Sequence, residues 1–386
     1  MAGMTDSPRS QIRFPGAELE IDLDAIERNY QRFVRTLGAA ECGATVKADA
    51  YGLGVAHVAP VLWDAGCRTF FVATPAEGIE LRDILPEATI YIFNGAPRDW
   101  EYHFIESRLI PVLNSLSDIS AWATFARAMG ATPAPAALHF DSGMNRLGLS
   151  AAEVETLVAE PHRAPFDIPC VMSHLACADK PDEDMTARQR DRFAAAAEAF
   201  IEARCDAGLG DDRPRLSLAN SAGILIDESY HFDLARPGIG LYGGNPFTDR
   251  PSPVDNVIRL RGRILQIREV SPPDTVGYGA THEVTGPGRI ATVDVGYGDG
   301  YLRCFGEGNG WAVINGHRVP VAGRVSMDSH ALDITALPLD DCGVGTMVDL
   351  LGGPVPLDDV VKTTGLSGYE LLTLLGHRYN RVYKKT

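Results

Sequence analysis

The sequence predicts an α/β fold in which an N-terminal (β/α)8 barrel of the TIM type is followed by a mainly-β domain. Over the first two-thirds of the 386 residues, eight short β-rich runs alternate with helix-like stretches. Such alternation predicts a parallel sheet, and eight units are the number that closes a barrel. Beyond Gly244 the helical spacing gives way to runs that alternate polar and apolar side chains. We therefore predict a barrel over residues 14–244 and a β domain over residues 245–386.

The chain begins with a predicted strand and an amphipathic helix. ELEID, from Glu18, alternates polar and apolar residues, and this strand is a candidate to pack with the second domain. The segment DLDAIERNYQRFVRTLG carries apolar side chains at helical spacing, namely Ile26, Tyr30, Phe33 and Leu37. Asp24 is expected to cap this helix and Gly38 to end it.

The eight β-rich runs follow in order, with helices between them. They are centred near Thr45, Phe70, Ile90, Val112, Leu138, Val171, Leu216 and Leu234. Helical stretches follow Thr74 and Leu149, and the longest predicted helix extends from Met185 to Ala207. An open, doubly wound sheet also fits a similar number of units. However, no G-x-G-x-x-G follows a strand, so a barrel is favoured over a dinucleotide-binding sheet.

The second domain is expected to consist mainly of strands. PFTDRPSPVDN is rich in Pro and Asp and is expected to be a linker. The segments VIRLRGRILQIREV, GRIATVDVGYG, WAVINGHRVPVAGRV and HALDIT then alternate along their length, divided by turns such as Asn315-Gly316. Helical spacing returns only in GYELLTLLGHRYNRVY, which predicts a terminal helix.

Charge, cysteines and hydropathy exclude several classes of protein. The 35 Lys and Arg residues against 51 Asp and Glu give a formal net charge of −16, which disfavours nucleic acid and membrane surfaces as partners. The seven cysteines are scattered without a C-x-x-C pair, so we expect neither a metal site nor a disulfide framework. The sequence shows no secretory signal and no apolar run of membrane-spanning length, so we expect a soluble, cytoplasmic protein.

Polar side chains of different kinds stand at the carboxyl ends of the predicted barrel strands, where the active sites of such barrels lie. They are Lys47, Asp141 with Arg146, His174, Asn220 with Ser221, and Arg236. Each of them alone is more often an ordinary loop residue. Together they predict a functional site at the mouth of the barrel, where the carboxyl ends of the strands meet.

Lys47 has two interpretations, because it is flanked by small and apolar residues at the end of the first barrel strand. Its stem could lie along the strand end and carry the amine to solvent. Alternatively, the amine is desolvated and has a lowered pKa, which suits it to form a Schiff base. A Schiff base needs a carbonyl partner, and pyridoxal phosphate is the common one.

A pyridoxal phosphate site has three further requirements, and the sequence has a candidate for each. The phosphate needs backbone N–H groups after late strands, which Asn220-Ser221 and Gly238-Ile239 could supply. The pyridine nitrogen needs a charged partner, and Arg236 is two residues before Gly238. A substrate carboxylate needs a fixed cation, and Arg146 could bind it through two hydrogen bonds.

These residues belong to motifs that resemble those of the alanine racemases, a family of fold-type III pyridoxal phosphate enzymes. The matching segments extend over nearly the whole chain and are TVKADAYGLG, DSGMNRLGL, SHLA, LANSAG, ARPGIGLYGG, VGYGATH, VGYGDGY, GRVSMD and Tyr369-Glu370. Lys followed by Tyr four residues later in KADAYG is fairly specific. Its combination with RPGIGLYG and two GYG segments is very specific. The family's fold, a cofactor-binding barrel with a β domain, agrees with the fold predicted above.

The resemblance implies interconversion of L- and D-alanine by two bases, supplying D-alanine for peptidoglycan, in a homodimer with shared active sites. Lys47 would bind pyridoxal phosphate and act as one base. Tyr278, contributed by the second subunit, would act as the other base, and His174 would support it. The implied cofactor contacts are Lys47, Tyr51, Arg146, His174, Asn220, Ser221, Arg236, Gly238, Ile239 and Tyr369. The implied substrate contacts are Arg146, Met327 and Tyr297.

Two positions depart from the family's pattern. Many members have a carbamylated lysine that orients the substrate-binding arginine, but this chain has His139 there, seven residues before Arg146. The family often has a histidine against the arginine that faces the pyridine nitrogen, but this chain has Ser217. The resemblance therefore does not predict what supports Arg146 and Arg236.

Three alternative functions share parts of this pattern. A racemase of broad specificity, acting on serine or larger amino acids, would have nearly the same residues. A fold-type III amino-acid decarboxylase would share both domains but is expected to lack Tyr278 in its GYG setting. A non-enzymatic protein of pyridoxal phosphate homeostasis would be a single barrel, so the β domain with Tyr278 and Met327 disfavours it.

Overall fold

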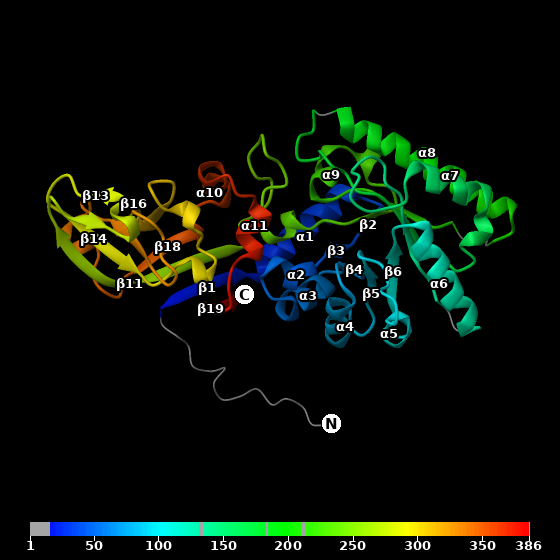
Figure 1. Ribbon diagram of the computed structural model, residues 1–386, viewed down its shortest axis with the longest axis horizontal. Helices are drawn as coiled ribbons and strands as arrows, with labels where there is room; N and C mark the ends of the chain where they lie inside the picture. Colours follow the sequence, from blue (N-terminus) through cyan, green and yellow to red (C-terminus); the bar gives the residue numbers. More distant parts are fainter. Residues whose placement is uncertain (1–15, 131–133, 183, 210–212, 386) are drawn as a thin grey trace, which may run out of the picture. The chain divides into compact units, whose positions relative to one another are not determined.

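The computed structural model describes residues 16–130, 134–182, 184–209 and 213–385 and divides the chain into two compact units (Figure 1). The divisions fall after Ala25 and after Asp255. These limits differ from the predicted 14–244 and 245–386, and residue 14 lies outside the described residues. In the described ranges, no helix is both long enough and apolar enough to span a bilayer.

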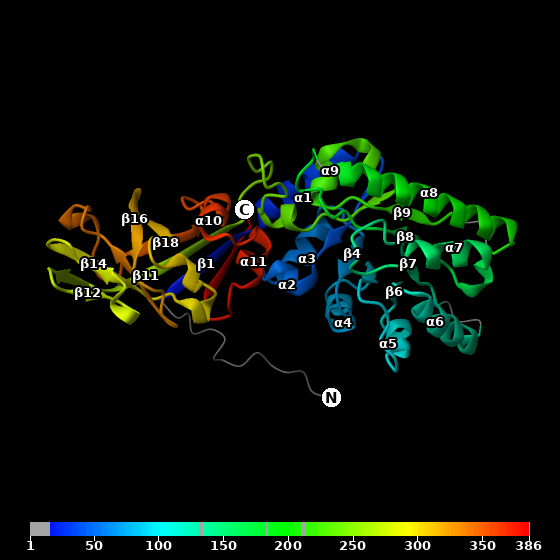
Figure 2. The same cartoon turned by 45° about the horizontal axis from the view of Figure 1, so that its top comes forward.

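The strands of the unit 26–255 form a closed parallel ring. Seven pair in the order β3-β4-β5-β6-β7-β8-β9, and the last of these lie side by side in Figure 2. β2 continues into β3 around Gly43 and pairs in parallel with β10. The Asp233 N–H donates to the Leu216 carbonyl at 3.0 Å, which links β10 to β9 and closes the ring. The (β/α)8 barrel predicted from the sequence is confirmed.

The barrel strands are short and almost wholly buried. Their bounds are Glu41–Cys42 (β2), Ala44–Thr45 (β3), Thr69–Val72 (β4), Thr89–Ile92 (β5), Leu109–Leu113 (β6), Ala137–His139 (β7), Cys170–Met172 (β8), Arg215–Ser217 (β9) and Leu234–Ala235 (β10). Strands buried on both faces are near-continuous apolar runs, as TFFV in β4 and TIYI in β5 illustrate. All eight β-rich runs of the sequence lie at barrel strands.

Helices surround the ring (Figure 1). They are Leu23–Leu37 (α1), Lys47–Tyr51 (α2), Val55–Asp64 (α3), Pro75–Ile84 (α4), Glu101–Glu106 (α5), Leu116–Met129 (α6), Ala151–Ala159 (α7), Asp184–Asp206 (α8) and Ser221–Ile226 (α9). Serine and threonine hydroxyls begin several of them, because these side chains satisfy first-turn N–H groups. Thr74 and Ser150 each form a capping box with the glutamate three residues later.

The interior of the ring is a packed core and not a channel. Phe71, Tyr91, Val112, Cys170 and Leu234 are each fully buried in one cluster. The ring of Phe71 stacks on that of Tyr91 with centroids 5.2 Å apart. Because the interior is filled, it cannot hold a reaction site. In barrels of this kind the site lies at the carboxyl ends of the strands.

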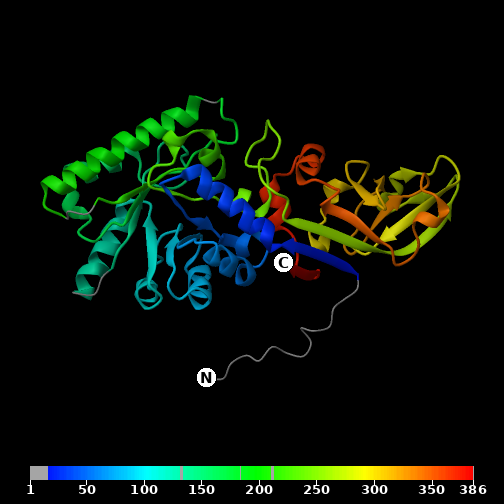
Figure 3. The same cartoon turned by 180° about the vertical axis from the view of Figure 1, so that it is seen from behind.

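The second unit is mainly β, as predicted. Its strands are Ala17–Asp22 (β1), Ile258–Val270 (β11), Thr275–Val276 (β12), His282–Glu283 (β13), Gly288–Val293 (β14), Trp311–Ile314 (β15), His317–Ala322 (β16), His330–Asp333 (β17), Met347–Gly352 (β18) and Asn380–Lys384 (β19). The larger sheet has the order β14-β17-β16-β15-β18-β11-β1-β19. The long strand β11 (Figure 3) also pairs with β14, so six of these strands close on themselves.

Two local expectations are wrong. The α1 helix begins at Leu23, and it is the Asp22 carboxylate, not Asp24, that accepts the Ala25 N–H at 2.8 Å. The predicted terminal helix is limited to Gly368–Thr373 (α11), preceded by Leu357–Thr364 (α10). Residues Asn380–Lys384 instead form β19, which pairs in parallel with β1. Backbone hydrogen bonds to a distant strand, which no local pattern reveals, decide the structure of this segment.

Candidate active site

Lys47 stands at the mouth of the barrel, two residues after β3, and its side chain is half-buried. Burial lowers the pKa of its amine below the ordinary value, and the nearby positive charge of Arg146 lowers it further. Glu77 opposes this shift. The Lys47 Nζ lies 5.9 Å from the centre of the Phe93 ring. A desolvated lysine of this kind is neutral more often than an exposed one, which makes it a better nucleophile and base.

In the segment labelled α2, the four residues after Lys47 form a left-handed turn and not a right-handed helix. Their φ angles are 53° for Ala48, Asp49 and Ala50 and 57° for Tyr51, a conformation that costs a non-glycine residue about 1–2 kcal/mol. The Glu77 carboxylate stabilises the turn by accepting the Ala48 N–H at 2.7 Å. The Asp49 carboxylate accepts the Val55 N–H at 2.7 Å. Strain of this kind is found where a structure must place particular side chains, here Lys47 and Tyr51.

Tyr51 closes one side of a small cradle. Its ring stacks on Tyr242 with centroids 4.7 Å apart. Its hydroxyl lies where a Cβ on Gly238 would be, so only glycine fits there without displacing Tyr51. The Ser221 hydroxyl accepts the Gly238 N–H at 2.9 Å and the Gly240 N–H at 3.3 Å. The cradle therefore consists of the Tyr51 hydroxyl, the Ser221 hydroxyl and the backbone of Gly238.

Asn220 and Ile239 complete the segments that form this cradle. The Asn220 Oδ1 accepts the Gly223 N–H at 2.9 Å and so caps the helix α9, which begins at Ser221. Ile239 is buried and opens a 3-10 turn that ends at Tyr242. Asn220 thus acts through its capping bond, which places the Ser221 hydroxyl against Gly238.

Arg236 is a buried cation. The side chain is 4% exposed, and burial lowers the pKa of its guanidinium to about 10, so it stays protonated near neutral pH. It donates to the Ser217 hydroxyl and, at 2.5 Å, to the Ser173 carbonyl. In the described ranges, no carboxylate pairs with it. Ser217, which departs from the family's pattern, is thus a direct partner of Arg236.

His174 and His139 are neutral histidines within electrostatic reach of Arg236 and Arg146. Burial, reinforced by these arginines, lowers the pKa of His139 to about 4 and holds that of His174 well below the ordinary value. The His139 Nδ1 lies 2.8 Å from the Asn114 Oδ1. Because Asn114 donates both hydrogens of its Nδ2 to backbone carbonyls, its Oδ1 accepts and His139 donates.

Arg146 lies on an exposed loop between β7 and α7, and no described side chain pairs with it. The Asp141 carboxylate shapes the start of this loop by accepting the N–H groups of Gly143, Met144 and Asn145. The Leu149 N–H donates to the His139 carbonyl at 2.7 Å and returns the loop to β7. Arg146 is therefore a free cation held near Lys47 by the backbone of its loop.

The β unit places Tyr297 and Met327 side by side. The Gly298 N–H donates to the Met327 carbonyl at 2.8 Å, and the side chains of Tyr297 and Met327 are 38% and 54% exposed. Arg378 joins their segments by donating to Asp299 at 2.6 Å and to Asp328 at 2.7 Å. Such a two-carboxylate clamp is a strong set of charged hydrogen bonds.

Tyr278 is the most exposed large aromatic side chain described, with 72% of its surface accessible. It follows Gly277, whose φ of 79° is a glycine conformation. Tyr369, at the second position of α11, is 47% exposed. The predicted residues thus form two groups, one within the barrel mouth and one on the β unit.

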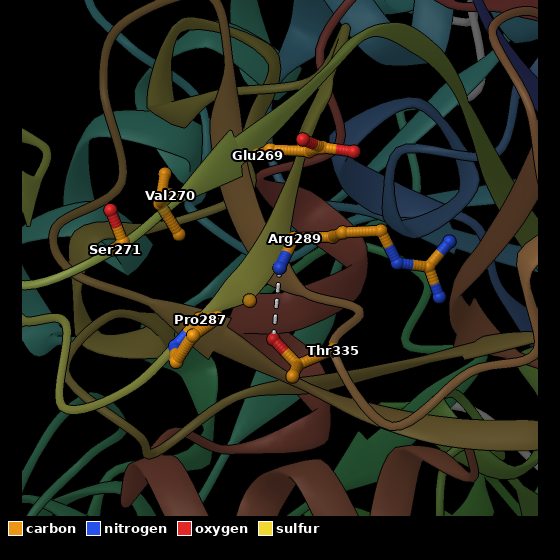
Figure 4. A pocket seen from close by; sticks show the side chains of 7 residues that line it. Glu269, Val270, Ser271, Pro287, Arg289 and Thr335 are labelled. Carbon is orange, nitrogen blue, oxygen red and sulfur yellow. Dashed lines mark hydrogen bonds between the residues drawn. The ribbon is translucent and has the colours of Figure 1, made fainter.

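A shallow pocket of about 400 Å³ lies on the β unit (Figure 4). Glu269, Ser271, Arg289 and Thr335 supply its polar lining. The Arg289 Nη2 donates to the Ile334 and Leu337 carbonyls. None of the predicted site residues lines this pocket, and the barrel mouth is the stronger candidate for a reaction site.

Two residues escaped the sequence predictions. Glu77 accepts three backbone N–H groups, from Ala48, Ala73 and Thr74, although the sequence marked it only as part of a helix. Gln189 is fully buried on α8. The sequence could have indicated this residue, because Gln189 lies at helical spacing from Phe193, Ala197 and Phe200, which are the apolar residues of the same buried face.

Fold and site together define a (β/α)8-barrel protein with a desolvated lysine at the mouth of the barrel. Two family models match the chain: "Alanine racemase, N-terminal domain" over residues 21–246 and "Alanine racemase, C-terminal domain" over residues 257–383. The chain belongs to the alanine racemase family.

Full-length relatives agree with this assignment. The alanine racemase of Rhodospirillum rubrum is 46% identical over 95% of this chain and 96% of its own length. The biosynthetic alanine racemase of Agrobacterium fabrum is 41% identical over 95% of this chain and 93% of its own length. The crystal structure of alanine racemase from Bartonella henselae with covalently bound pyridoxal phosphate superimposes with a TM-score of 0.89, at 35% identity, covering 96% of this chain and 99% of that one.

Proposed function

We propose that this chain interconverts L- and D-alanine with pyridoxal phosphate bound at the barrel mouth. The observation that carries the proposal is the grouping of a desolvated Lys47, a buried Arg236 without a carboxylate, and the cradle of Tyr51, Ser221 and Gly238. The relatives that match nearly the full length of the chain are alanine racemases.

The residues present fit this cofactor. The Ser221 oxygen accepts the Gly238 and Gly240 N–H groups, so the Ser221 hydroxyl proton can be donated to an anionic oxygen beside Tyr51. Arg236 can only donate hydrogen bonds, and two of its bonds go to Ser217 and Ser173. Its remaining donors suit an acceptor such as a pyridine nitrogen. When bound, pyridoxal phosphate supplies electron withdrawal that acidifies the substrate's Cα–H.

The barrel residues have distinct tasks in this proposal. Lys47 holds the cofactor and, once released by the substrate amine, takes or returns a proton on one face of Cα. Arg236 keeps its proton near neutral pH, so it would donate a hydrogen bond to the pyridine nitrogen rather than protonate it, and the bound cofactor would withdraw electrons less strongly. Weaker electron withdrawal would disfavour transamination as a side reaction. Arg146 binds the substrate carboxylate.

The opposite face of Cα needs a second base, because inversion without turning the substrate requires one on each side. We assign this role to Tyr278 of the partner subunit, in a homodimer. Tyr278, Tyr297 and Met327 are exposed in the single chain, so a second copy can cover them and exclude water. The neutral His174 would accept or donate a hydrogen bond that orients this tyrosine. Tyr369 would add its hydroxyl to the phosphate contacts.

The proposed setting follows from the product. D-Alanine is a precursor of peptidoglycan, so the enzyme would act in the cytoplasm, where the precursor is assembled. No helix able to cross a membrane is found over the described residues.

A chiral assay of the purified protein with pyridoxal phosphate tests the proposal. L-Alanine, L-serine, L-lysine and L-glutamate are supplied separately, and both enantiomers are quantified. We expect D-alanine to accumulate until both enantiomers are equal, and Lys47→Ala to form none. Faster turnover of serine or lysine would instead establish a racemase of broader specificity. Carbon dioxide release without racemisation would establish a decarboxylase and contradict the proposal.

A further inference from the structure

Gln189 is a polar residue in the buried face of the longest helix. Its side chain is completely inaccessible, and the stripe continues along α8 with Phe193, Ala197 and Phe200. Burying an amide without hydrogen-bond partners costs about 1–3 kcal/mol. Burial of a glutamine at this position therefore requires that residues packed on α8 form hydrogen bonds with its side-chain amide.

The partners of the amide all belong to the loops that follow β7 and β8. The Gln189 Oε1 accepts the Ala176 N–H at 2.8 Å. Its Nε2 donates to the His174 carbonyl at 2.9 Å and to the Ser142 hydroxyl at 3.3 Å. A backbone N–H can only donate and a carbonyl can only accept, so these bonds allow one orientation of the amide.

The same network continues to Arg236. Ser142 and Ser173 are both buried, and their hydroxyl oxygens lie 2.8 Å apart. The Ser142 oxygen accepts from Gln189, so its own proton is available to Ser173. The Ser173 carbonyl in turn accepts from Arg236 at 2.5 Å. Gln189 is thus joined to the segments that carry His174, Arg146 and the partner of Arg236.

We propose that Gln189 is a positioning residue of the reaction. It sets the backbone of the β8 loop, which carries His174, against the start of the β7 loop, which carries Arg146. It touches neither substrate nor cofactor and acts only through these two loops. This inference rests on the proposed function, because that function gives His174 and Arg146 their tasks.

The alternative is that Gln189 only stabilises the packing of α8 on the barrel. The two roles predict different results for Gln189→Leu, which keeps the volume and removes all three hydrogen bonds. A packing role predicts a lower unfolding midpoint with unchanged kinetics of the folded protein. A positioning role predicts loss of kcat/KM at temperatures where the variant is fully folded, because small displacements of catalytic groups can reduce rates by about 100-fold.

Thr186 supplies a matched control one turn earlier on the same helix face. It is 1% exposed, and its hydroxyl is buried without a hydrogen-bond partner among the described residues. Thr186→Val therefore alters the same buried face without breaking a bond to either loop. Ser142→Ala provides a second test, because it removes one of the three bonds of Gln189 together with the hydrogen bond between Ser142 and Ser173.

The experiment measures kcat/KM for alanine and hydrogen exchange of peptides covering residues 140–148 and 172–178. For Gln189→Leu we expect kcat/KM to fall about 10- to 100-fold and both peptides to exchange faster, with β14 unchanged. Thr186→Val should match the wild type in both measurements. Ser142→Ala should also lower kcat/KM, and the variant with both changes should lose less than the two single losses multiplied together, because the residues share one network.

Wild-type kcat/KM in folded Gln189→Leu, with either peptide unchanged, would overturn the proposal. If Gln189→Leu does not fold, Ser142→Ala decides: wild-type kinetics together with wild-type exchange in both peptides would overturn it. If the wild type does not racemise alanine, the proposed function fails. The exchange of the two peptides then still decides whether Gln189 holds the two loops together.

Discussion

The hydroxyl of Tyr51 occupies the place that a Cβ on residue 238 would need, so these two residues from opposite ends of the barrel sequence are complementary. Gly238→Ala should displace the phenol and close the cradle between Tyr51 and Ser221. We expect the affinity for pyridoxal phosphate to fall at least about tenfold, equivalent to 1.4 kcal/mol, in a titration followed by absorbance.

A matched control separates this effect from a general loss of glycine. A Cβ on Gly286 would meet no atom within 4 Å, so Gly286→Ala should bind the cofactor as the wild type does. Unchanged affinity in Gly238→Ala would show that the cradle does not hold the cofactor.

The left-handed turn after Lys47 predicts a stabilising substitution. Ala48 is exposed with a φ of 53°, and glycine adopts this conformation without the cost that alanine bears. After allowing for the greater freedom of glycine in the unfolded chain, Ala48→Gly should raise the free energy of unfolding by about 0.5 kcal/mol in urea.

The sign of this effect distinguishes the turn from an ordinary helix. Ala76 is exposed in the right-handed helix α4, where glycine should lower the free energy of unfolding by about 0.5–1 kcal/mol. A loss of stability in both variants would contradict the left-handed conformation of residue 48.

The lowered pKa of His139 predicts acid sensitivity. Unfolded histidine binds a proton below its ordinary pKa of about 6.5, whereas folded His139 stays neutral down to its pKa of about 4. The unfolded state therefore binds more protons between these values, and stability falls as the pH falls through that window. His139→Gln can still donate to Asn114 but does not titrate.

The slope of stability against pH tests this assignment. Between pH 6 and pH 5, His139→Gln should lose less stability than the wild type, by up to about 1.4 kcal/mol per pH unit. Equal slopes in the two proteins would contradict a neutral, buried His139 in the folded state. Burial also lowers the pKa of His330 to about 4, so this residue contributes to the slope of stability against pH in both the wild type and His139→Gln.

The barrel and its mouth were predictable because their signals are local. Apolar strands such as TFFV and TIYI are continuous runs, and Lys47 lies two residues after another strand, β3. Once the strands close in order, topology alone brings Lys47, Arg146 and Arg236 to one end. The residue types at strand ends therefore predicted which side chains lie at the barrel mouth.

Other features depend on contacts between distant residues and were not predictable. Ala48 and Ala50 favour a right-handed helix, and only the Glu77 carboxylate and the packing of Tyr51 explain their left-handed turn. β19 is a strand because β1 lies beside it. Ser217 becomes the partner of Arg236 only when β9 and β10 are neighbours.

The central claim is that Lys47 of one subunit and Tyr278 of the other form a single site. The most direct test is a heterodimer of a Lys47→Ala chain and a Tyr278→Ala chain, purified through two different affinity tags. Each homodimer has two defective sites, whereas the heterodimer has one intact and one doubly defective site. We expect inactive homodimers and a heterodimer with about half the wild-type rate of D-alanine formation, as twofold symmetry requires. A heterodimer as inactive as its parents would contradict the shared site.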